Sequence, residues 1–312
     1  MYNNAMKQAE LQQGLQHAIE FLGASQGADG GWGYGIGKQS YPEPTCYALL
    51  ALASSEPARE PSQRQQRALA WLTAHTNQAG ALTHLKQAES SADLNVFDNW
   101  GTIIAFFTLQ KLGIGTELRA RYLRYLLNSR GNLLDKKVSQ ELKLNGDLQA
   151  WSWARGTASW VEPTAYALLG LKANGMQAHE RVQVGENFLF DRACYDGGWN
   201  YGNKEVLKIV IEPMPTNTCY ALLALQDVDR SHETIKKSVA YLEQEVAARQ
   251  SSLLLALAVL CLDIYERPVE NLLTGLLARQ QENGSWRDNI HLTALAALAL
   301  QTAVHQKNIF KL

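Results

Sequence analysis

The chain has 312 residues, of which 46% are hydrophobic and 19% are charged, and its formal net charge is -1. This is the composition of a globular protein with room for one large domain or two small ones. A nearly neutral chain lacks the basic excess that nucleic-acid-binding proteins carry, so we expect no nucleic acid as its partner.

The distribution of apolar residues predicts no transmembrane helix. The longest apolar run covers residues 253–262, which is shorter than the roughly 18–20 residues that a membrane span needs. The polar segment 1–16 contains no signal-peptide core. No CxxC pair occurs among the four cysteines, which suit a reducing compartment: Cys46, Cys194, Cys219 and Cys261. We therefore expect a cytoplasmic protein that makes at most peripheral contact with a membrane.

A repeated ten-residue segment organises the chain. Residues 43–52 read EPTCYALLAL, residues 162–171 read EPTAYALLGL, and residues 216–225 read TNTCYALLAL. Each copy predicts the start of an apolar helix. The threonine of each copy is expected at the N-cap, where its hydroxyl would accept hydrogen bonds from free backbone N–H groups: Thr45, Thr164 and Thr218.

In chain order, amphipathic segments alternate with segments that are apolar all round. The pattern predicts amphipathic helices at residues 8–23, 67–74, 118–127, 181–190, 233–245 and 269–280. Apolar helices are predicted to start at residues 45, 102, 164, 218, 252 and 291. No segment shows the alternation of a β-strand. Residues 128–157 are too long for a simple connection, so we interpret them as an insert.

Six helical hairpins of this kind predict two concentric layers, with apolar helices inside and amphipathic helices outside. A closed ring is favoured over an open solenoid because neither end pair has the polar face of a cap. The sequence thus predicts an all-α fold, an (α/α)6 toroid. It would be one domain over residues 1–312 with a long insert at about 128–157.

Glycine–tryptophan turns join several of the hairpins. Gln26 precedes Gly31-Trp32, Gln281 precedes Gly284-Ser285-Trp286, and Gly197-Gly198-Trp199 lacks the upstream glutamine. These turns resemble the QW motif of the squalene-cyclase and protein-prenyltransferase superfamily, and the resemblance covers essentially the whole chain. It implies an (α/α)6 toroid, in one copy rather than the two of squalene-hopene cyclases. In such turns the tryptophans are expected to pack between hairpins.

The resemblance also implies a position for a catalytic acid. In cyclases of this superfamily an Asp-x-Asp-Asp-Thr-Ala motif opens an inner helix, and its middle Asp protonates the substrate. Alignment with the repeated segment puts Glu162, and in the first copy Glu43, at the acid position. The flanking Asp residues are absent and a proline replaces the last one, so the alternative is that Glu-Pro-Thr only starts a helix. Asp93 and Asp98, before the second apolar helix, are further acid candidates.

A zinc site is the alternative chemistry that the resemblance implies. Protein prenyltransferase β subunits bind zinc through Asp-x-Cys at one inner helix and a His at a later one. Residues 217–219 and 287–291 resemble these segments and would supply Cys219, Asp288 and His291. Asparagine replaces the first ligand and His291 lies one place out of register, which favours a core cysteine and a core histidine. We therefore expect no metal and no cofactor.

Aromatic residues cluster in the turns that lead into the apolar helices, so one mouth of the ring is expected to be aromatic. Aromatic faces stabilise carbocations by about 0.5–2 kcal/mol each, and they also stack on sugars. Three of the tryptophans, at positions 151, 153 and 160, fit no position of the repeat and lie close to residue 162 in the sequence. The candidates for substrate contact are Trp100, Trp151, Trp153, Trp160, Tyr166 and Tyr201.

These features favour an enzyme that resembles class II terpene cyclases. Such an isomerase would protonate a small isoprenoid or other apolar substrate in the central cavity. Two alternatives stay open: a non-catalytic binding or scaffold toroid that has lost the acid, and a carbohydrate-active (α/α)6 enzyme with two facing carboxylates.

Overall fold

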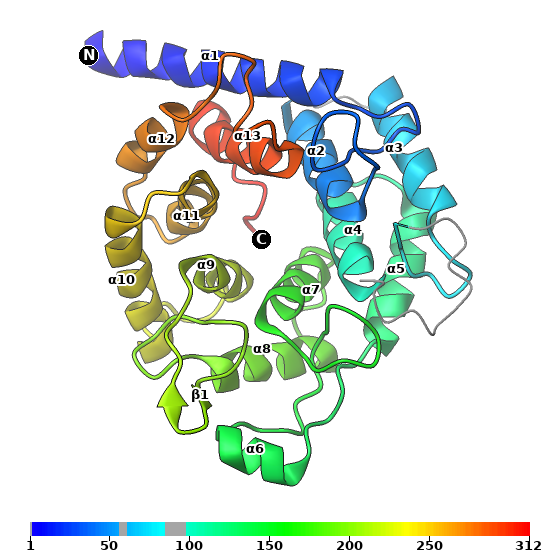
Figure 1. The fold of residues 1–312 in the computed structure, drawn as a ribbon, viewed down its shortest axis with the longest axis vertical. Helices are drawn as coiled ribbons and strands as arrows, with labels where there is room; N and C mark the ends of the chain where they lie inside the picture. The colour runs from blue at the N-terminus through cyan, green and yellow to red at the C-terminus, as the bar shows by residue number, and fades with distance from the viewer. Residues whose placement is uncertain (1, 56–60, 85–97) are drawn as a thin grey trace.

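The structure is a computed structural model that describes residues 2–55, 61–84 and 98–312. Six of the described helices form an inner layer: α2 (Pro42–Ser55), α4 (Asp98–Leu112), α7 (Val161–Ala173), α9 (Pro215–Ala224), α11 (Ser252–Ile264) and α13 (Ile290–His305). Six others form an outer layer: α1 (Tyr2–Ala24), α3 (Gln63–Ala74), α5 (Thr116–Asn128), α8 (Glu180–Arg192), α10 (Glu233–Ala248) and α12 (Glu270–Leu277). The short helix α6 (Lys136–Leu142) lies outside both layers, within the expected insert (Figure 1).

The inner helices form a closed ring. Each of them packs against its neighbours in chain order, and α13 packs against α2 to complete the circle (Figure 1). Helix α1 contacts both α13 and α2 and so covers this closure from outside. From α3 onward, each outer helix packs against the inner helix that precedes it in the chain. The predicted all-α (α/α)6 toroid is confirmed.

Burial follows the two layers. Every residue of α9 from Asn217 to Ala224 is buried, because an inner helix contacts other helices on all sides. Helix α10 buries only Ile235, Ser238, Leu242 and Val246, which lie three or four residues apart on one face. This difference explains why the inner segments are apolar all round and the outer segments are amphipathic.

The loop before α9 contains two short strands that the sequence pattern did not predict. Strand β1 (Glu205–Val206) pairs antiparallel with β2 (Ile209–Val210). The connecting Leu207 and Lys208 have φ angles of 51° and 65°, the left-handed backbone that tight hairpin turns use. Strands of two residues are too short to produce a detectable alternation.

The repeated threonines are not N-caps, contrary to the prediction. Helices α2, α7 and α9 all begin three residues before their threonine, so the hydroxyl lies inside the first turn. There it accepts the backbone N–H of a tryptophan in the preceding turn. The N···O distances are 2.9 Å from Trp32 to Thr45, 3.2 Å from Trp151 to Thr164 and 3.0 Å from Trp199 to Thr218.

The same tryptophans join the inner layer to the outer layer. The indole N–H of Trp32 donates to the carbonyl of Leu22 in α1 at 2.9 Å, and that of Trp151 donates to Leu126 in α5 at 3.0 Å. Trp199 and Trp286 make the equivalent bonds to α8 and α12. All four side chains are fully buried. The expectation that the Gly-x-Trp tryptophans pack between hairpins is therefore confirmed.

The C-terminal tail closes the ring on the side where the inner helices end. Phe310 is fully buried, with its ring 5.2 Å from that of Phe107 in α4. Gln226 holds the tail by donating to the Phe310 carbonyl at 2.9 Å and accepting from the Leu312 N–H at 3.0 Å. Figure 1 shows the C-terminus at the centre of the ring. The centre of the toroid is consequently packed at this end.

The structure agrees with two expectations from the sequence, that the cysteines are buried and that no helix spans a membrane in the described part of the chain. All four cysteines are buried free thiols, so they act as small apolar residues in the core. None of the helices in the described part of the chain is both long and apolar enough to cross a bilayer.

Candidate functional site

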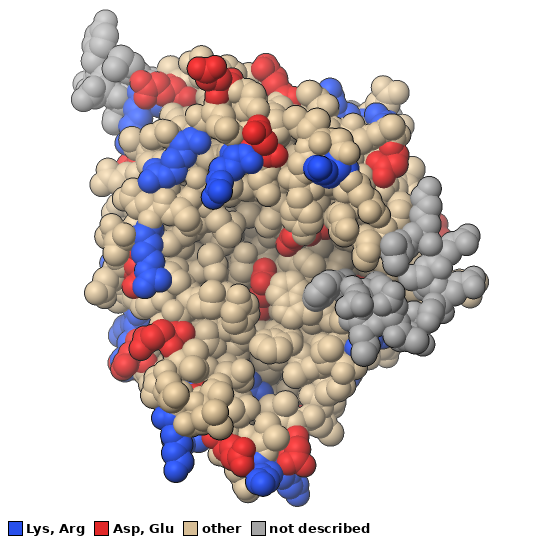
Figure 2. Space-filling view, in the orientation of Figure 1, with Lys and Arg blue, Asp and Glu red and all other residues tan. Residues whose placement is uncertain are grey.

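A pocket of about 610 Å³ opens on the face where the inner helices begin. Its walls are aromatic, and two carboxyl groups lie among them: Tyr34, Tyr41, Trp100, Trp153, Glu43 and Glu162. None of the described residues that line it is a lysine or an arginine. Figure 2 shows acidic side chains inside the hollow at the centre of this face, with basic side chains toward its periphery. The pocket therefore offers aromatic faces and carboxyl groups, and no lysine or arginine from the described chain.

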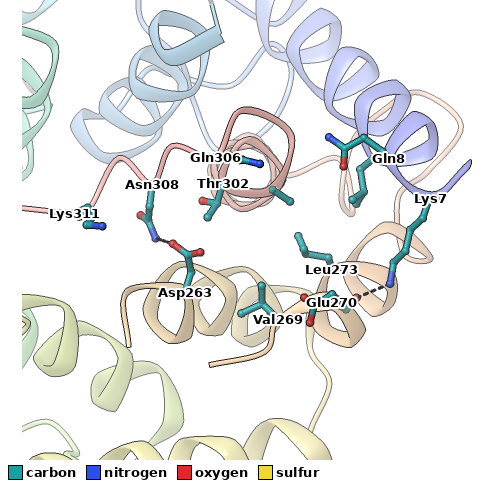
Figure 3. A pocket seen from close by; sticks show the side chains of 12 residues that line it. Lys7, Gln8, Asp263, Val269, Glu270, Leu273, Thr302, Gln306, Asn308 and Lys311 are labelled. Atoms are coloured by element: carbon teal, nitrogen blue, oxygen red, sulfur yellow. Dashed lines mark hydrogen bonds between the residues drawn. The ribbon is translucent and has the colours of Figure 1, made fainter. Parts of the chain in front are cut away.

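A larger cavity, of about 710 Å³, lies on the side where the inner helices end, between α1, α12 and α13 (Figure 3). No aromatic side chain is among its described lining residues. Two of its polar side chains are hydrogen-bonded within the lining: Lys7 donates to the Glu270 backbone carbonyl at 3.4 Å, and Asn308 donates to Asp263 at 2.9 Å. We therefore place the candidate site in the aromatic pocket.

Glu162 lies in the first turn of α7 and faces the pocket. Two effects together raise the pKa of its carboxyl to about 8. Burial is the larger, and the negative charge of Glu43 is the second. A hydrogen bond with the Tyr220 side chain acts in the opposite direction. Glu162 is therefore mainly protonated at neutral pH, the state that a general acid needs.

Glu43 occupies the equivalent position in the first turn of α2 but has different neighbours. The hydroxyl of Tyr34 donates to its Oε2 atom. Nδ1 of His291 lies 4.0 Å from the same oxygen. Burial lowers the pKa of His291, so its imidazole is mainly neutral at pH 7. The two carboxyl groups of the pocket thus have different neighbours.

A layer of tyrosines forms the floor beneath the carboxyl groups. Tyr166 is fully buried; its hydroxyl is hydrogen-bonded to that of Tyr47, and its ring lies 5.3 Å from Trp100, edge to face. Tyr220 packs against Tyr166 at 5.5 Å. Below this layer, Phe310 of the tail contacts Tyr166 at 6.2 Å. Tyr166, expected to contact substrate, is not among the described residues that line the pocket and supports those that do.

Trp100 and Trp153, two of the expected substrate contacts, meet in the pocket wall. Their ring centroids are 4.8 Å apart, and the backbone N–H of Trp100 donates to the Trp153 carbonyl at 3.1 Å. Trp100 belongs to the first turn of α4 and Trp153 to the insert. The insert thereby contributes one wall of the pocket.

Trp151 does fit a position of the repeat, contrary to the sequence interpretation. It occupies the place of Trp32 in its hairpin and is fully buried, with the guanidinium of Arg181 4.1 Å above its ring. It was missed because Gln149-Ala150 replaces the usual glycine pair before it. In the second hairpin Leu82 takes this place and donates to Thr102 at 2.8 Å. Trp151 joins helices and does not line the pocket.

Trp160 and Tyr201 lie elsewhere. Their rings are 6.5 Å apart, and Trp160 borders a separate cavity of about 180 Å³ near α6. Tyr201 is 50% exposed. Neither residue is among the described lining of the aromatic pocket, so the structure does not bring them to the carboxyl groups.

Asp98, a further acid candidate, is not among the described residues that line the pocket. Asp98 is buried, and its Oδ2 atom lies 2.6 Å from Nε of Arg155 and 3.3 Å from the Tyr125 hydroxyl. It anchors the insert to α4 and has no free face for a substrate. Asp93 lies outside the described residues.

The three zinc candidates do not converge. Cys219 is fully buried against Cys261, His291 faces Glu43, and Asp288 is bound to Asn283 in a turn at 2.7 Å. In the part of the chain that the structure describes, no three His, Cys, Asp or Glu side chains are grouped to hold a metal. The sequence missed Tyr41 and His84 as pocket residues, because neither belongs to the repeated segment.

The raised pKa of Glu162 predicts a pH dependence of stability. The folded protein keeps Glu162 protonated up to about pH 8, whereas the unfolded chain releases this proton near pH 4.5. The contribution of Glu162 to the free energy of unfolding is therefore complete below about pH 4.5 and is lost as pH rises to about 8. We expect Glu162→Gln, which cannot ionise, to become more stable than the parent across this window, by a few kcal/mol at about pH 8. Thermal unfolding from about pH 4 to 9 measures the difference.

Glu180→Gln is the matched control, because Glu180 lies in the first turn of an outer helix. Its curve should run parallel to that of the parent. A constant offset between Glu162→Gln and the parent at all pH values would contradict a raised pKa.

No family model matches the chain, and none of the curated proteins matches it in sequence. Solved structures do match its fold. The type II terpene cyclase MstE from Scytonema has a TM-score of 0.65 and 13% identity, covering 96% of this chain and 99% of that one. A wild-type glycosidase has a TM-score of 0.66 and 11% identity, covering 96% and 98%. A protein from Actinoplanes has a TM-score of 0.62 and 14% identity, covering 94% and 99%. At these identities the likeness concerns the fold.

Proposed function

We propose that this protein is a class II terpene-cyclase-like isomerase, in which Glu162 protonates an isoprenoid or similar apolar substrate. The observation that carries the proposal is a carboxyl group that is neutral near pH 7, in an aromatic pocket whose described lining contains no lysine or arginine. The fold shared with a terpene cyclase that was also solved with a product, merosterolic acid A, supports it.

The chemistry requires a proton donor, a wall for the cation and a proton acceptor. Glu162 adds its proton to a carbon–carbon double bond, whose π electrons form the new C–H bond and leave a carbocation. A second double bond of the same chain attacks that cation and closes a ring. The faces of Trp100 and Trp153 stabilise the positive charge, by about 0.5–2 kcal/mol each. Loss of a proton to Glu43 forms the final double bond, so the product is an isomer of the substrate.

The environments of the two carboxyl groups suit this division of roles. Glu43 accepts a hydrogen bond from Tyr34, and its charge favours the protonated form of Glu162. A proton taken up by Glu43 returns the pair to its starting state when it passes to Glu162. The packed tyrosine floor and the buried Phe310 exclude water from below, which protects a carbocation from hydration.

The test is incubation of purified protein with linear polyprenols and with oxidosqualene, followed by mass spectrometry of the extracts. We expect a cyclic product of unchanged mass in H₂O, and one added deuterium when the reaction runs in D₂O. Recovery of only the linear substrates, without deuterium, would contradict the proposal.

A glycosidase is the second candidate. Two carboxyl groups in one pocket, one of them protonated, also fit acid-catalysed glycoside cleavage, and Trp100 and Trp153 could stack on a sugar ring. Glycosidase structures share the fold, one of them a variant in complex with glucose. Release of nitrophenol from 4-nitrophenyl glycosides, with no product from polyprenols, would decide for this alternative.

A further inference from the structure

Another hollow, of about 440 Å³, lies at the C-terminal end of α5, and three arginines are among its lining residues: Arg124, Arg130 and Arg155. We call it the arginine pocket. None of the described residues that line it is an aspartate or a glutamate. Arg155 is paired with Asp98, so Arg124 and Arg130 carry the positive charge at this hollow that has no carboxylate partner in the described chain. The arrangement therefore favours an anion between the guanidinium groups.

The carboxylate beside this pocket is already engaged. Asp98 is 4% exposed and accepts both the Nε and the backbone N–H of Arg155, at 2.6 and 3.2 Å. The Tyr125 hydroxyl also faces it. These bonds fix Arg155 through its Nε atom and leave its two terminal nitrogens for another acceptor. Asp98 thus orients an arginine and does not occupy the pocket.

Backbone carbonyls hold two arginines at this pocket, Arg130 in its lining and Arg181 behind it. Arg130 donates Nη1 to the carbonyls of Leu127 and Ser129, which holds its guanidinium at the end of α5. The buried Arg181 donates to the Ser129 carbonyl at 3.0 Å. Burial and the nearby charge of Arg130 lower the pKa of Arg181 to about 10. These guanidinium groups lie close together although they repel one another. A bound anion would offset this repulsion.

The arginine pocket shares a wall with the aromatic pocket. Residues 152–156 run between them, with Trp153 lining the aromatic pocket and Arg155 and Gly156 lining the arginine pocket. The first turn of α4 is divided in the same way, since Trp100 faces one pocket and Asn99 faces the other. A ligand that holds Arg155 would therefore stiffen the segment that carries Trp153.

We propose that the arginine pocket binds a small phosphate-type oxyanion, such as inorganic phosphate or pyrophosphate. The planar guanidinium group presents paired N–H donors whose spacing matches two oxygens of a phosphate, and charge-assisted bonds of this kind are strong. Arg124 and Arg130 supply donors from the end of α5, and Arg155 supplies them from the insert. The site is separate from the proposed cyclase chemistry and stands or falls independently of it.

The test is isothermal titration calorimetry of the full chain with inorganic phosphate and with pyrophosphate at low ionic strength. We expect saturable binding of one anion per chain to the parent. Arg124→Ala should weaken it by about tenfold and Arg124→Glu should abolish it. Arg249→Ala is the matched control, because Arg249 is an exposed arginine at the end of another outer helix, and it should bind like the parent.

Two results would overturn the proposal. One is the absence of saturable heat with either anion. The other is equal binding by Arg124→Ala and Arg249→Ala, which would mean that the anion responds only to net charge. Hydrogen exchange gives an independent readout: pyrophosphate should slow exchange in residues 152–156 of the parent and not of Arg124→Glu. Circular dichroism establishes that each variant is folded.

Discussion

Replacing Glu162 by glutamine is expected to lower cyclase turnover by roughly 10²–10⁴-fold, the usual effect of losing a general acid. Glutamine keeps the size of the side chain but has no acidic proton to give. Since it removes a group whose ionised form is disfavoured in the folded protein, the variant should stay folded and become more stable than the parent above about pH 4.5. The measurement is steady-state turnover of the best polyprenyl substrate, with thermal unfolding of the same preparation.

Glu43→Gln separates the two carboxyl groups. The negative charge of Glu43 raises the pKa of Glu162, so its removal should lower that pKa. In the parent, kcat/KM should fall above about pH 8, where Glu162 loses its proton; in Glu43→Gln the fall should begin at lower pH. Glu180→Gln should leave the pH profile unchanged.

Turnover by Glu162→Gln within about twofold of the parent would remove Glu162 from the mechanism.

Replacing Trp151 by alanine is expected to destabilise the protein by about 3–5 kcal/mol. The change removes a fully buried indole, its hydrogen bond to the Leu126 carbonyl and its contact with Arg181. Urea denaturation measures the loss. Trp199→Ala is the matched comparison, because Trp199 occupies the same place in another hairpin and donates to Leu189 at 2.6 Å. The two variants should lose similar stability.

Trp153→Ala should behave in the opposite way. Trp153 is only partly buried and lines the aromatic pocket. Its loss should therefore cost only about 1 kcal/mol of stability, and it should reduce turnover more than Trp151→Ala does. If Trp151→Ala instead unfolds at nearly the same urea concentration as the parent but loses turnover, Trp151 belongs to the site and its structural role is wrong.

The toroid could be predicted because its main determinants are local and repeated. A segment such as Glu162–Leu171 carries both the apolar face of an inner helix and the threonine of its first turn, and a third, partly altered copy keeps them. The hydrogen bond expected for this threonine, Thr164, was wrong, because its hydroxyl was expected to cap the helix and accepts the backbone N–H of Trp151 instead. Its partner, the backbone N–H of Trp151, lies 13 residues away, and helix-cap statistics describe only nearby N–H groups.

The candidate site was predictable in part. The repeat and its resemblance to cyclase motifs pointed to Glu162 and Glu43, and the clustering of aromatics pointed to Trp100 and Trp153. Asp98 was a further acid candidate from its position before an inner helix, although a solvated or capping role was favoured for it. The ion pair with Arg155, which lies 57 residues away, could not be read from the chain, and this pair removes Asp98 from the list of acids.

The order of helices, their inner or outer place and the position of the two glutamates at helix starts follow from the pattern of residues along the chain. Their roles follow from contacts between distant segments. Tyr34 bonds Glu43, the charge of Glu43 acts on Glu162, and the insert brings Trp153 to Trp100. A pKa depends on burial and on neighbouring charges, which exist only once the ring has closed. Two glutamates in nearly identical segments therefore acquire different surroundings from the hairpins around them.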